Sequence, residues 1–201
     1  DNGTLLWSSG LGHSDKAYLC KLRPDMEGMQ VFMVSEPKKE DGRGVSVVDA
    51  ATGKLIWGIG HTTYHVGDGM VADFDPAHPG LECFASEDRK GGSTDRYLLT
   101  ADGKKLQVSQ DEIPGCRNWI WWDADLLRET FKGDDNRWGE GDWREELITA
   151  LPGELRIYRT NIPATDRRVT LMQDALYRSY VAHRSMGYPQ APVPSYYLGD
   201  N

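Results

Sequence analysis

A motif that returns after about fifty residues, short strand-like runs and glycine-containing hairpin turns together predict an all-β chain made of β-propeller blades. Repeated units of this length, each with several short strands, are typical of propeller blades. The motif shares a histidine, a proline, a glycine and a phenylalanine at one offset of 52 residues: His13, Pro24, Gly28 and Phe32, then His65, Pro76, Gly80 and Phe84. A β-sandwich is the alternative fold, but a sandwich would not repeat one motif at a fixed offset.

Each of these two copies is followed by a strand-like run and a hairpin signal. The turns are Ala-Thr-Gly-Lys at 51–54 and Ala-Asp-Gly-Lys at 101–104. Glycine at such a place supplies the positive φ that tight hairpins need. Strands are expected over residues 30–34, 45–48, 97–100 and 154–158.

Two further copies extend the repeat towards the C-terminus. A third begins in the tryptophan-rich stretch 119–125, where Asp123 and Asp125 lie 50 residues beyond Asp73 and Asp75. A fourth, compressed copy covers Gly-Asp-Trp-Arg-Glu-Glu at 141–146 and the strand after it. The chain is therefore expected to hold about three to four blades or part-blades, with residues 1–201 forming part of a single propeller domain.

Composition excludes several classes of partner. The chain has 201 residues and a net charge of −8 without a basic block, so nucleic acid is not an expected partner. There is no run of about eighteen apolar residues, so no membrane insertion is expected. The start, Asp-Asn-Gly, does not resemble a secretion signal, and a mature secreted protein or an internal fragment would both begin this way. The three cysteines, Cys20, Cys83 and Cys116, lack metal-type spacing and are interpreted as small buried apolar residues.

The surplus of acidic residues includes a candidate calcium group in the second copy. Asp73, Asp75 and Glu82 lie around a turn, and calcium takes six to eight oxygens from such alternate aspartates and a later glutamate. The first copy acts as an internal control, because its equivalents are Lys21, Arg23 and Gln30. The first copy thus lacks all three acids and has two basic side chains among the replacements. This joint change favours the hypothesis that the three acids of the second copy bind one ion together.

The third copy keeps a similar group with a shorter turn, Asp123, Asp125 and Glu129. The alternative for both groups is that the acids cap turns and remain solvated. His13 and His65 occupy equivalent repeat positions, which favours loop-ordering hydrogen bonds or a place beside a metal ligand over a unique catalytic duty. Trp121 is expected in the core, with a sugar platform as the alternative.

Several motifs occur in a fixed order along the chain. They are Gly-Leu-Gly-His-Ser-Asp at 10–15, Asp-Phe-Asp-Pro at 73–76, Trp-Trp-Asp-Ala-Asp-Leu-Leu-Arg-Glu at 121–129, Gly-Asp-Trp-Arg-Glu-Glu at 141–146 and Thr-Leu-Met-Gln-Asp at 170–174. Together they resemble rhamnogalacturonan lyases of polysaccharide lyase family eleven. The resemblance runs from about Leu6 to Asp200 and covers nearly the whole chain.

This resemblance implies a fold, a reaction and a location. These lyases are eight-bladed propellers with several Ca²⁺ ions, and they cleave the rhamnose–galacturonate backbone of pectin by β-elimination. The implied partner is pectic rhamnogalacturonan, together with the remainder of the propeller if the chain is a fragment. A secreted, periplasmic or cell-surface location follows from the family alone.

The chain departs from the family between residues 129 and 141. The family carries an Asn-Gly-Thr-Lys motif there, which contacts sugar and supplies the lysine implicated in catalysis, and this motif is absent. Either the protein is shortened, or a stretch is missing from the sequence near Asn136 and Arg137. The catalytic residues are therefore unknown.

The expected substrate-binding residues are Tyr188, which matches a family tyrosine near the bound sugar, and Arg117. The alternative for Tyr188 is a packed aromatic in the C-terminal segment. Arg128 is a further basic residue that could face an anionic sugar, although an ion-paired arginine is the commoner case. A catalytically inactive polysaccharide-binding or scaffold propeller is the alternative function.

Overall fold

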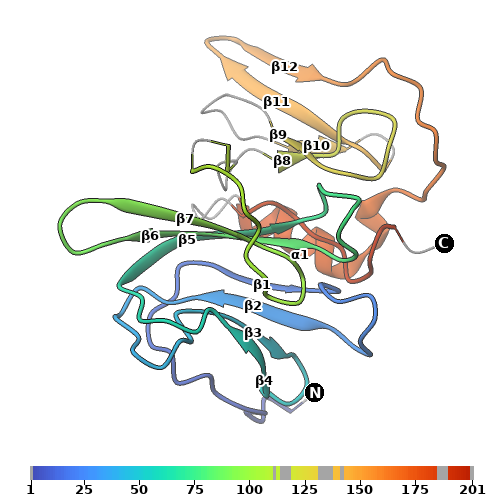
Figure 1. The fold of residues 1–201 in the computed structure, drawn as a ribbon. Helices are drawn as coiled ribbons and strands as arrows, with labels where there is room; N and C mark the ends of the chain where they lie inside the picture. The colour runs from blue at the N-terminus through green and yellow to red at the C-terminus, as the bar shows by residue number, and fades with distance from the viewer. Residues whose placement is uncertain are drawn as a thin grey trace.

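The computed structural model describes residues 2–110, 112–113, 119–130, 138–140, 143–184 and 190–199, with only the backbone for 138–140. It is an all-β structure in which the described residues include one α-helix and one short 3-10 helix, so the predicted class is confirmed (Figure 1). The elements are β1 (Ala17–Cys20), β2 (Gln30–Val34), β3 (Val45–Asp49), β4 (Leu55–Gly58), β5 (His65–Ala72), β6 (Glu82–Asp88), β7 (Thr94–Leu99), β8 (Trp119–Ile120), β9 (Glu129–Thr130), β10 (Trp138–Glu140), β11 (Glu145–Leu151), β12 (Glu154–Tyr158), η1 (Leu171–Gln173) and α1 (Ala175–Arg184).

Each sheet contains strands that are neighbours along the chain and pair antiparallel. The strand orders are β1-β2-β3-β4, β5-β6-β7, β8-β9 and β10-β11-β12. In Figure 1 the first sheet lies at the bottom of the view, the second across the middle, and β8 to β12 at the top. The two copies that begin at His13 and His65 therefore each start a new sheet.

The hairpin turns of the first two sheets are closed by tryptophans that repeat at a spacing of 50 residues. The indole N–H of Trp7 donates to the carbonyl of Ala50, and that of Trp57 donates to Ala101, both at 2.9 Å. Each ring also covers the glycine of its turn, Gly53 or Gly103, and both glycines have positive φ. A Cβ on Gly103 would lie 2.7 Å from the Trp57 ring, so this turn needs glycine both for φ and for space.

The main hydrophobic core lies between the first two sheets. Tyr18, Phe32, Met70 and Cys83 are among its buried members. Helix α1 is attached to this core by Tyr180, whose hydroxyl accepts from the N–H of Leu19 (2.7 Å) and donates to its carbonyl (3.2 Å). The helix thereby brings the C-terminal part of the chain against the first sheet.

A second, smaller core surrounds Trp121, Trp143 and Tyr177. Trp121 is 3% exposed, which confirms its predicted place in the interior. Residues 190–194, close to the C-terminus, form no helix or strand and are buried, with Ala191 and Val193 nearly inaccessible. These residues therefore belong to the packed interior.

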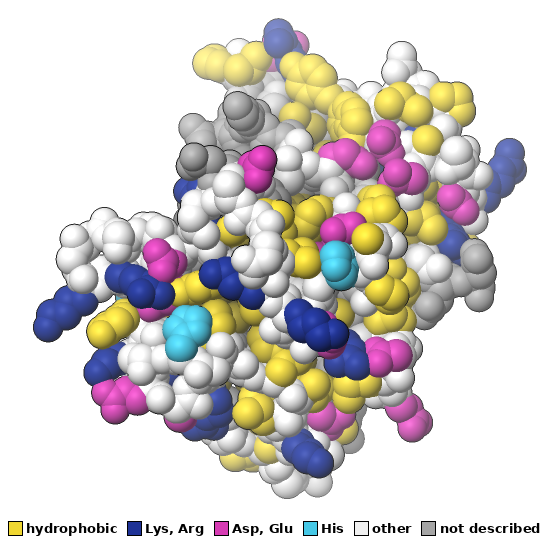
Figure 2. All heavy atoms as spheres, in the orientation of Figure 1, with side chains coloured by type: hydrophobic (Ala, Val, Ile, Leu, Met, Phe, Trp, Pro, Cys, Tyr) yellow, Lys and Arg dark blue, Asp and Glu magenta, His cyan; other side chains and the backbone are white. Residues whose placement is uncertain are grey.

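Strand β12 is exposed along its whole length. Leu155 and Ile157 on β12 are each 63% exposed. Figure 2 shows hydrophobic atoms at the surface in this region, at the top of the view. No helix in the described part of the chain is long and apolar enough to cross a membrane.

Candidate functional site

The turn between β5 and β6 holds the first predicted calcium group. Ala72 pairs with Glu82, so Asp73 and Asp75 lie at the base of the turn. Oε2 of Glu82 accepts hydrogen bonds from the N–H groups of Phe74 (3.1 Å) and Asp75 (3.2 Å). Its Oε1 and the Oδ1 of Asp73 are buried without a hydrogen-bond partner among the described residues. Two such oxygens fit the hard-cation ligands that calcium prefers.

The electrostatics of this turn disfavour the charged carboxylates when no cation is bound. Burial raises the pKa of Glu82 to about 8 and the pKa of Asp73 to about 6. The carboxylates of Asp125 and Asp75 raise the Asp73 pKa further. Because Asp125 belongs to the third copy, the acidic groups of the second and third copies lie close enough to repel each other. A bound divalent cation would oppose both effects.

The Asp75 carboxylate is engaged within its own turn. Oδ1 accepts from the N–H of Ala77 at 3.0 Å, and Oδ2 lies 3.0 Å from Nδ1 of His78. The bond from Ala77 is the largest cause that keeps the pKa of Asp75 below its usual range. Among the described residues, the ligand atoms of Asp73, Asp75 and Glu82 do not all lie within 4.8 Å of one another. The two buried oxygens without a hydrogen-bond partner belong to Asp73 and Glu82.

The third copy brings its predicted group together. Ligand atoms of Asp123, Asp125 and Glu129 all lie within 4.8 Å of one another. Glu129 reaches under the turn, where its Oε2 accepts from the N–H of Trp122 at 2.8 Å. Burial raises the pKa of Glu129 to about 7. Three convergent carboxylates, one of them with a raised pKa, form a compact candidate cation site.

The strand register corrects the correspondence between copies. Three pairs close the three turns: Cys20–Gln30, Ala72–Glu82 and Ile120–Glu129. Counted from these pairs, Asp123 corresponds to Asp75, and Trp121 takes the place of Asp73. The offset of 50 residues taken from the sequence is wrong by two across this turn. Asp123 also repeats the local bond of Asp75, because its Oδ1 accepts from the N–H two residues later, at 3.0 Å.

The first copy fills its turn with a side-chain cation. Nζ of Lys21 donates to the carbonyl of Met26 and, at 3.2 Å, to that of Gly28. Gln30 stands in the place of Glu82, and its side-chain oxygen also accepts a backbone N–H of the turn, at 2.9 Å. An ammonium thus bonds the turn carbonyls where the second copy has acids, as expected if a cation serves that turn.

A second type of candidate cation site lies before β1. His13, Asp15 and Glu36 place ligand atoms within 4.8 Å of one another, and His13 Nδ1 is 2.8 Å from Glu36 Oε2. His65 approaches the other Glu36 oxygen at 3.7 Å. The hydrogen bond with Glu36 is the largest cause that raises the pKa of Asp15. The sequence predicts loop-ordering hydrogen bonds or a place beside a metal ligand for both histidines. It does not reveal this cluster, because Glu36 follows a different strand and has no motif spacing to them.

Arg128 is buried and does not face solvent. Its guanidinium lies 3.3 Å from Glu145 Oε1, with both side chains fully buried, and 3.7 Å from the centroid of the Trp121 ring. The Tyr177 hydroxyl donates to the same Glu145 oxygen at 2.6 Å. Arg128 therefore stabilises the second core, and the suggestion that it faces substrate is wrong.

The two predicted substrate-binding residues, Arg117 and Tyr188, lie outside the described residues. Cys116 does as well. Cys20 and Cys83 are buried free thiols, as predicted, and burial raises the pKa of both.

Comparison with known proteins assigns the chain to an enzyme family. The family model described as "Rhamnogalacturonan lyase family 11, C-terminal domain" matches residues 1–140 and 139–201. The chain belongs to this family.

Named relatives agree with this assignment. The chain is 37% identical over 236 residues to rhamnogalacturonan endolyase YesW of Bacillus subtilis (strain 168), covering 99% of this chain and 36% of the relative. It is 32% identical over 241 residues to rhamnogalacturonan exolyase YesX of the same strain, covering 98% and 39%. The solved structure of Bacillus licheniformis rhamnogalacturonan lyase PL11 aligns with a TM-score of 0.83 and 34% identity, over 98% of this chain and 38% of that one. The chain thus spans under two fifths of the length of these relatives.

Proposed function

We propose that this chain is the C-terminal part of the catalytic β-propeller of a pectin-degrading rhamnogalacturonan lyase, which cleaves the rhamnose–galacturonate backbone by β-elimination. The likeness to the endolyase, 37% identity along 99% of the chain, carries the proposal. Four sheets of consecutive antiparallel strands support a propeller of several blades. A polymeric pectic substrate would place the protein outside the cell, as a secreted, periplasmic or cell-surface enzyme.

The reaction needs two things from the protein. A base must remove the C5 proton of galacturonate, and positive charge must neutralise the adjacent carboxylate as negative charge builds up there. This acidic chain must supply that charge locally, from arginine or lysine side chains or from bound cations.

Calcium is part of the proposal, at the turn of Asp73, Asp75 and Glu82 and at the turn of Asp123, Asp125 and Glu129. The support at the first turn is the pair of buried oxygens without partners among the described residues, and at the second it is the convergence of three carboxylates. The cluster of His13, Asp15 and Glu36 is a third candidate. When bound, calcium supplies fixed positive charge that neutralises these carboxylates and ties the turns. The protein supplies the carboxylate oxygens, and hydrogen bonds from backbone N–H groups orient the side chains of Glu82 and Glu129.

A catalytically inactive polysaccharide-binding propeller is the second candidate, and one observation favours it. The family match falls into two pieces that meet at residues 139–140, and the alignments with both relatives are longer than this chain. The relatives therefore have residues without a counterpart here. The break between the two pieces supports a loss close to the place where the Asn-Gly-Thr-Lys motif of the family is expected.

Ultraviolet absorbance of the unsaturated product, measured on rhamnogalacturonan with calcium present, tests whether this chain cleaves the polysaccharide by itself. We expect no more than trace product from this chain, together with measurable polysaccharide binding. A clear rise in absorbance would exclude the inactive alternative. Absence of both product and binding would overturn the proposed function.

A further inference from the structure

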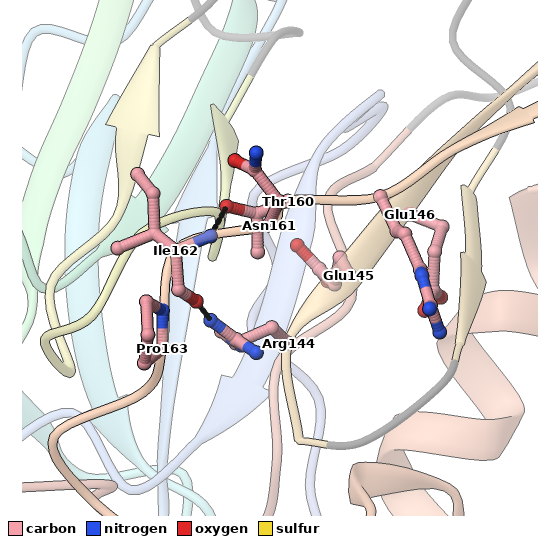
Figure 3. Close-up of a pocket in the computed structure, with 8 residues that line it drawn as sticks. Arg144, Glu145, Glu146, Thr160, Asn161, Ile162 and Pro163 are labelled. Carbon is pink, nitrogen blue, oxygen red and sulfur yellow. Dashed lines mark hydrogen bonds between the residues drawn. The ribbon is translucent and has the colours of Figure 1, made fainter.

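An open pocket of about 680 Å³ lies between β11 and the segment that follows β12 (Figure 3). Its walls include Arg144, Arg159, Thr160, Asn161, Ile162 and Pro163. This volume is within the range of small-molecule sites. Most of the described residues that line the pocket are polar or charged, and Ile162 and Pro163 add apolar surface. The carboxylates of the two acidic turns are not among the described residues that line it, so the pocket is separate from those candidate cation sites.

The charges of the pocket differ in exposure. Arg159 is exposed, and no ion pair forms between it and the other described residues. The two carboxylates that line the pocket, Glu145 and Glu146, are only 2% and 8% exposed. Glu145 is paired internally with Arg128 and Tyr177. A ligand would therefore meet a guanidinium more readily than a carboxylate.

Arg144 holds the wall formed by the segment that follows β12. Its Nη1 donates to the carbonyl of Ile162 at 2.7 Å, as Figure 3 shows, and to that of Asp123 at 3.3 Å. The N–H of Ile162 donates to Thr160 Oγ1 at 3.1 Å, and this local hydrogen bond stabilises the segment at residues 160–162. The wall is therefore preorganised, and one guanidinium connects it with the acidic turn of the third copy.

We propose that this pocket is a subsite for an acidic sugar, in which Arg159 binds the carboxylate of a galacturonate residue. A planar guanidinium binds a carboxylate with two parallel hydrogen bonds, which a neutral sugar cannot offer. Asn161 and Thr160 supply polar groups suited to sugar hydroxyls, and the exposed side chain of Ile162 offers apolar surface to the ring. The sugar class rests on the proposed function; the location and the role of Arg159 rest on the pocket.

The test uses trigalacturonate and its methyl ester as probes of ¹⁵N-labelled protein. Trigalacturonate is expected to shift the amide signals of Thr160, Asn161 and Ile162, and the uncharged ester to bind at least about tenfold more weakly. Arg159→Gln should weaken trigalacturonate binding by about tenfold or more. The matched control is Arg156→Gln, an arginine three residues earlier that is already paired with Glu154, and it should change affinity less than about twofold.

The outcomes separate this proposal from the proposed function. Equal affinity of wild type and Arg159→Gln, or shifts confined to other parts of the chain, would overturn the subsite while leaving pectic binding intact. Equal binding of the acid and the ester would show that charge is not recognised and would also overturn it. Failure of wild type to bind either trigalacturonate or rhamnogalacturonan would overturn both proposals.

Discussion

The Lys21 ammonium donates to the carbonyl of Gly28 at 3.2 Å, across the turn that corresponds to Asp73–Glu82 in the next copy. One turn therefore carries a covalently attached cation, and the next carries acids with two buried oxygens that have no partner among the described residues. The same backbone turn thus accommodates either a lysine ammonium or a group of carboxylates that a bound cation would neutralise.

Removal of calcium is expected to lower the melting temperature. A ligand that binds only the folded state, at a free concentration of about a hundred times its Kd, stabilises that state by about 2.7 kcal/mol. Differential scanning calorimetry with and without a calcium chelator, followed by calcium or magnesium addition, measures the effect. Calcium should restore the transition and magnesium should restore less. An unchanged melting temperature in chelator would contradict the proposed sites.

Replacing the three acids of the second copy by the residues of the first copy should remove the calcium ion proposed at that turn. The variant Asp73→Lys, Asp75→Arg, Glu82→Gln copies Lys21, Arg23 and Gln30. We expect it to fold and to bind one calcium fewer per chain by native mass spectrometry. Glu154→Gln, at an exposed carboxylate, is the control and should keep the wild-type count. An unchanged count in the triple variant would exclude an ion at this turn.

The calcium-free protein should lose stability as pH rises from about 5 to about 8. Burial raises the folded-state pKa of Asp73 to about 6, of Glu129 to about 7 and of Glu82 to about 8. A carboxyl whose folded pKa is raised binds more protons folded than unfolded, so its contribution is complete below the unfolded pKa and is lost as pH passes the folded value. Urea unfolding in chelator across this range measures the slope.

Glu82→Gln provides the matched variant for this pH dependence. It removes the ionisable group with the highest of the three pKa values and keeps an oxygen for the N–H groups of Phe74 and Asp75. Near pH 8 in chelator it should be more stable than wild type by about 1–3 kcal/mol. A slope as steep as that of wild type would show that Glu82 is not the source.

Gly103→Ala is expected to destabilise the protein by about 2–4 kcal/mol, because the new Cβ would be strained at positive φ and would collide with Trp57. Gly153→Ala is the control: Gly153 also has positive φ, but a Cβ on it would meet nothing within 4 Å among the described residues, so only about 1 kcal/mol is expected. Urea denaturation of both variants measures the difference. Equal losses would mean that the Trp57 contact contributes nothing.

Arg128→Met is expected to cost about 3–5 kcal/mol, because it leaves Glu145 buried without its cation. Arg156→Met, at an exposed pair, should change stability by less than about 0.5 kcal/mol. The double variant Arg128→Met, Glu145→Gln should recover part of the loss. Urea denaturation compares the three variants, and a small effect of Arg128→Met alone would show that the pair is not stabilising.

The sequence predicted the all-β class and the bounds of β2 and β12, because short alternating runs between glycine turns leave few other options. It also identified the acids of the third turn that converge. It could not predict the register of that turn, because the motif does not show that Ile120 pairs with Glu129, and this pairing puts Asp123 in the place of Asp75. The cluster at Glu36 was missed because strand pairing, which no local spacing encodes, brings Glu36 towards His13 and His65.

Trp57 leaves the end of β4 to close a turn after β7, so it joins the first sheet to the second. Units linked in this way lose a contact when a neighbour opens, and this couples their unfolding. A change in length inside one unit would move the indole away from its turn, whereas removal of a complete unit would let the next tryptophan take the same place. We therefore expect the gain or loss of a whole unit to disturb the packing less than the gain or loss of part of one.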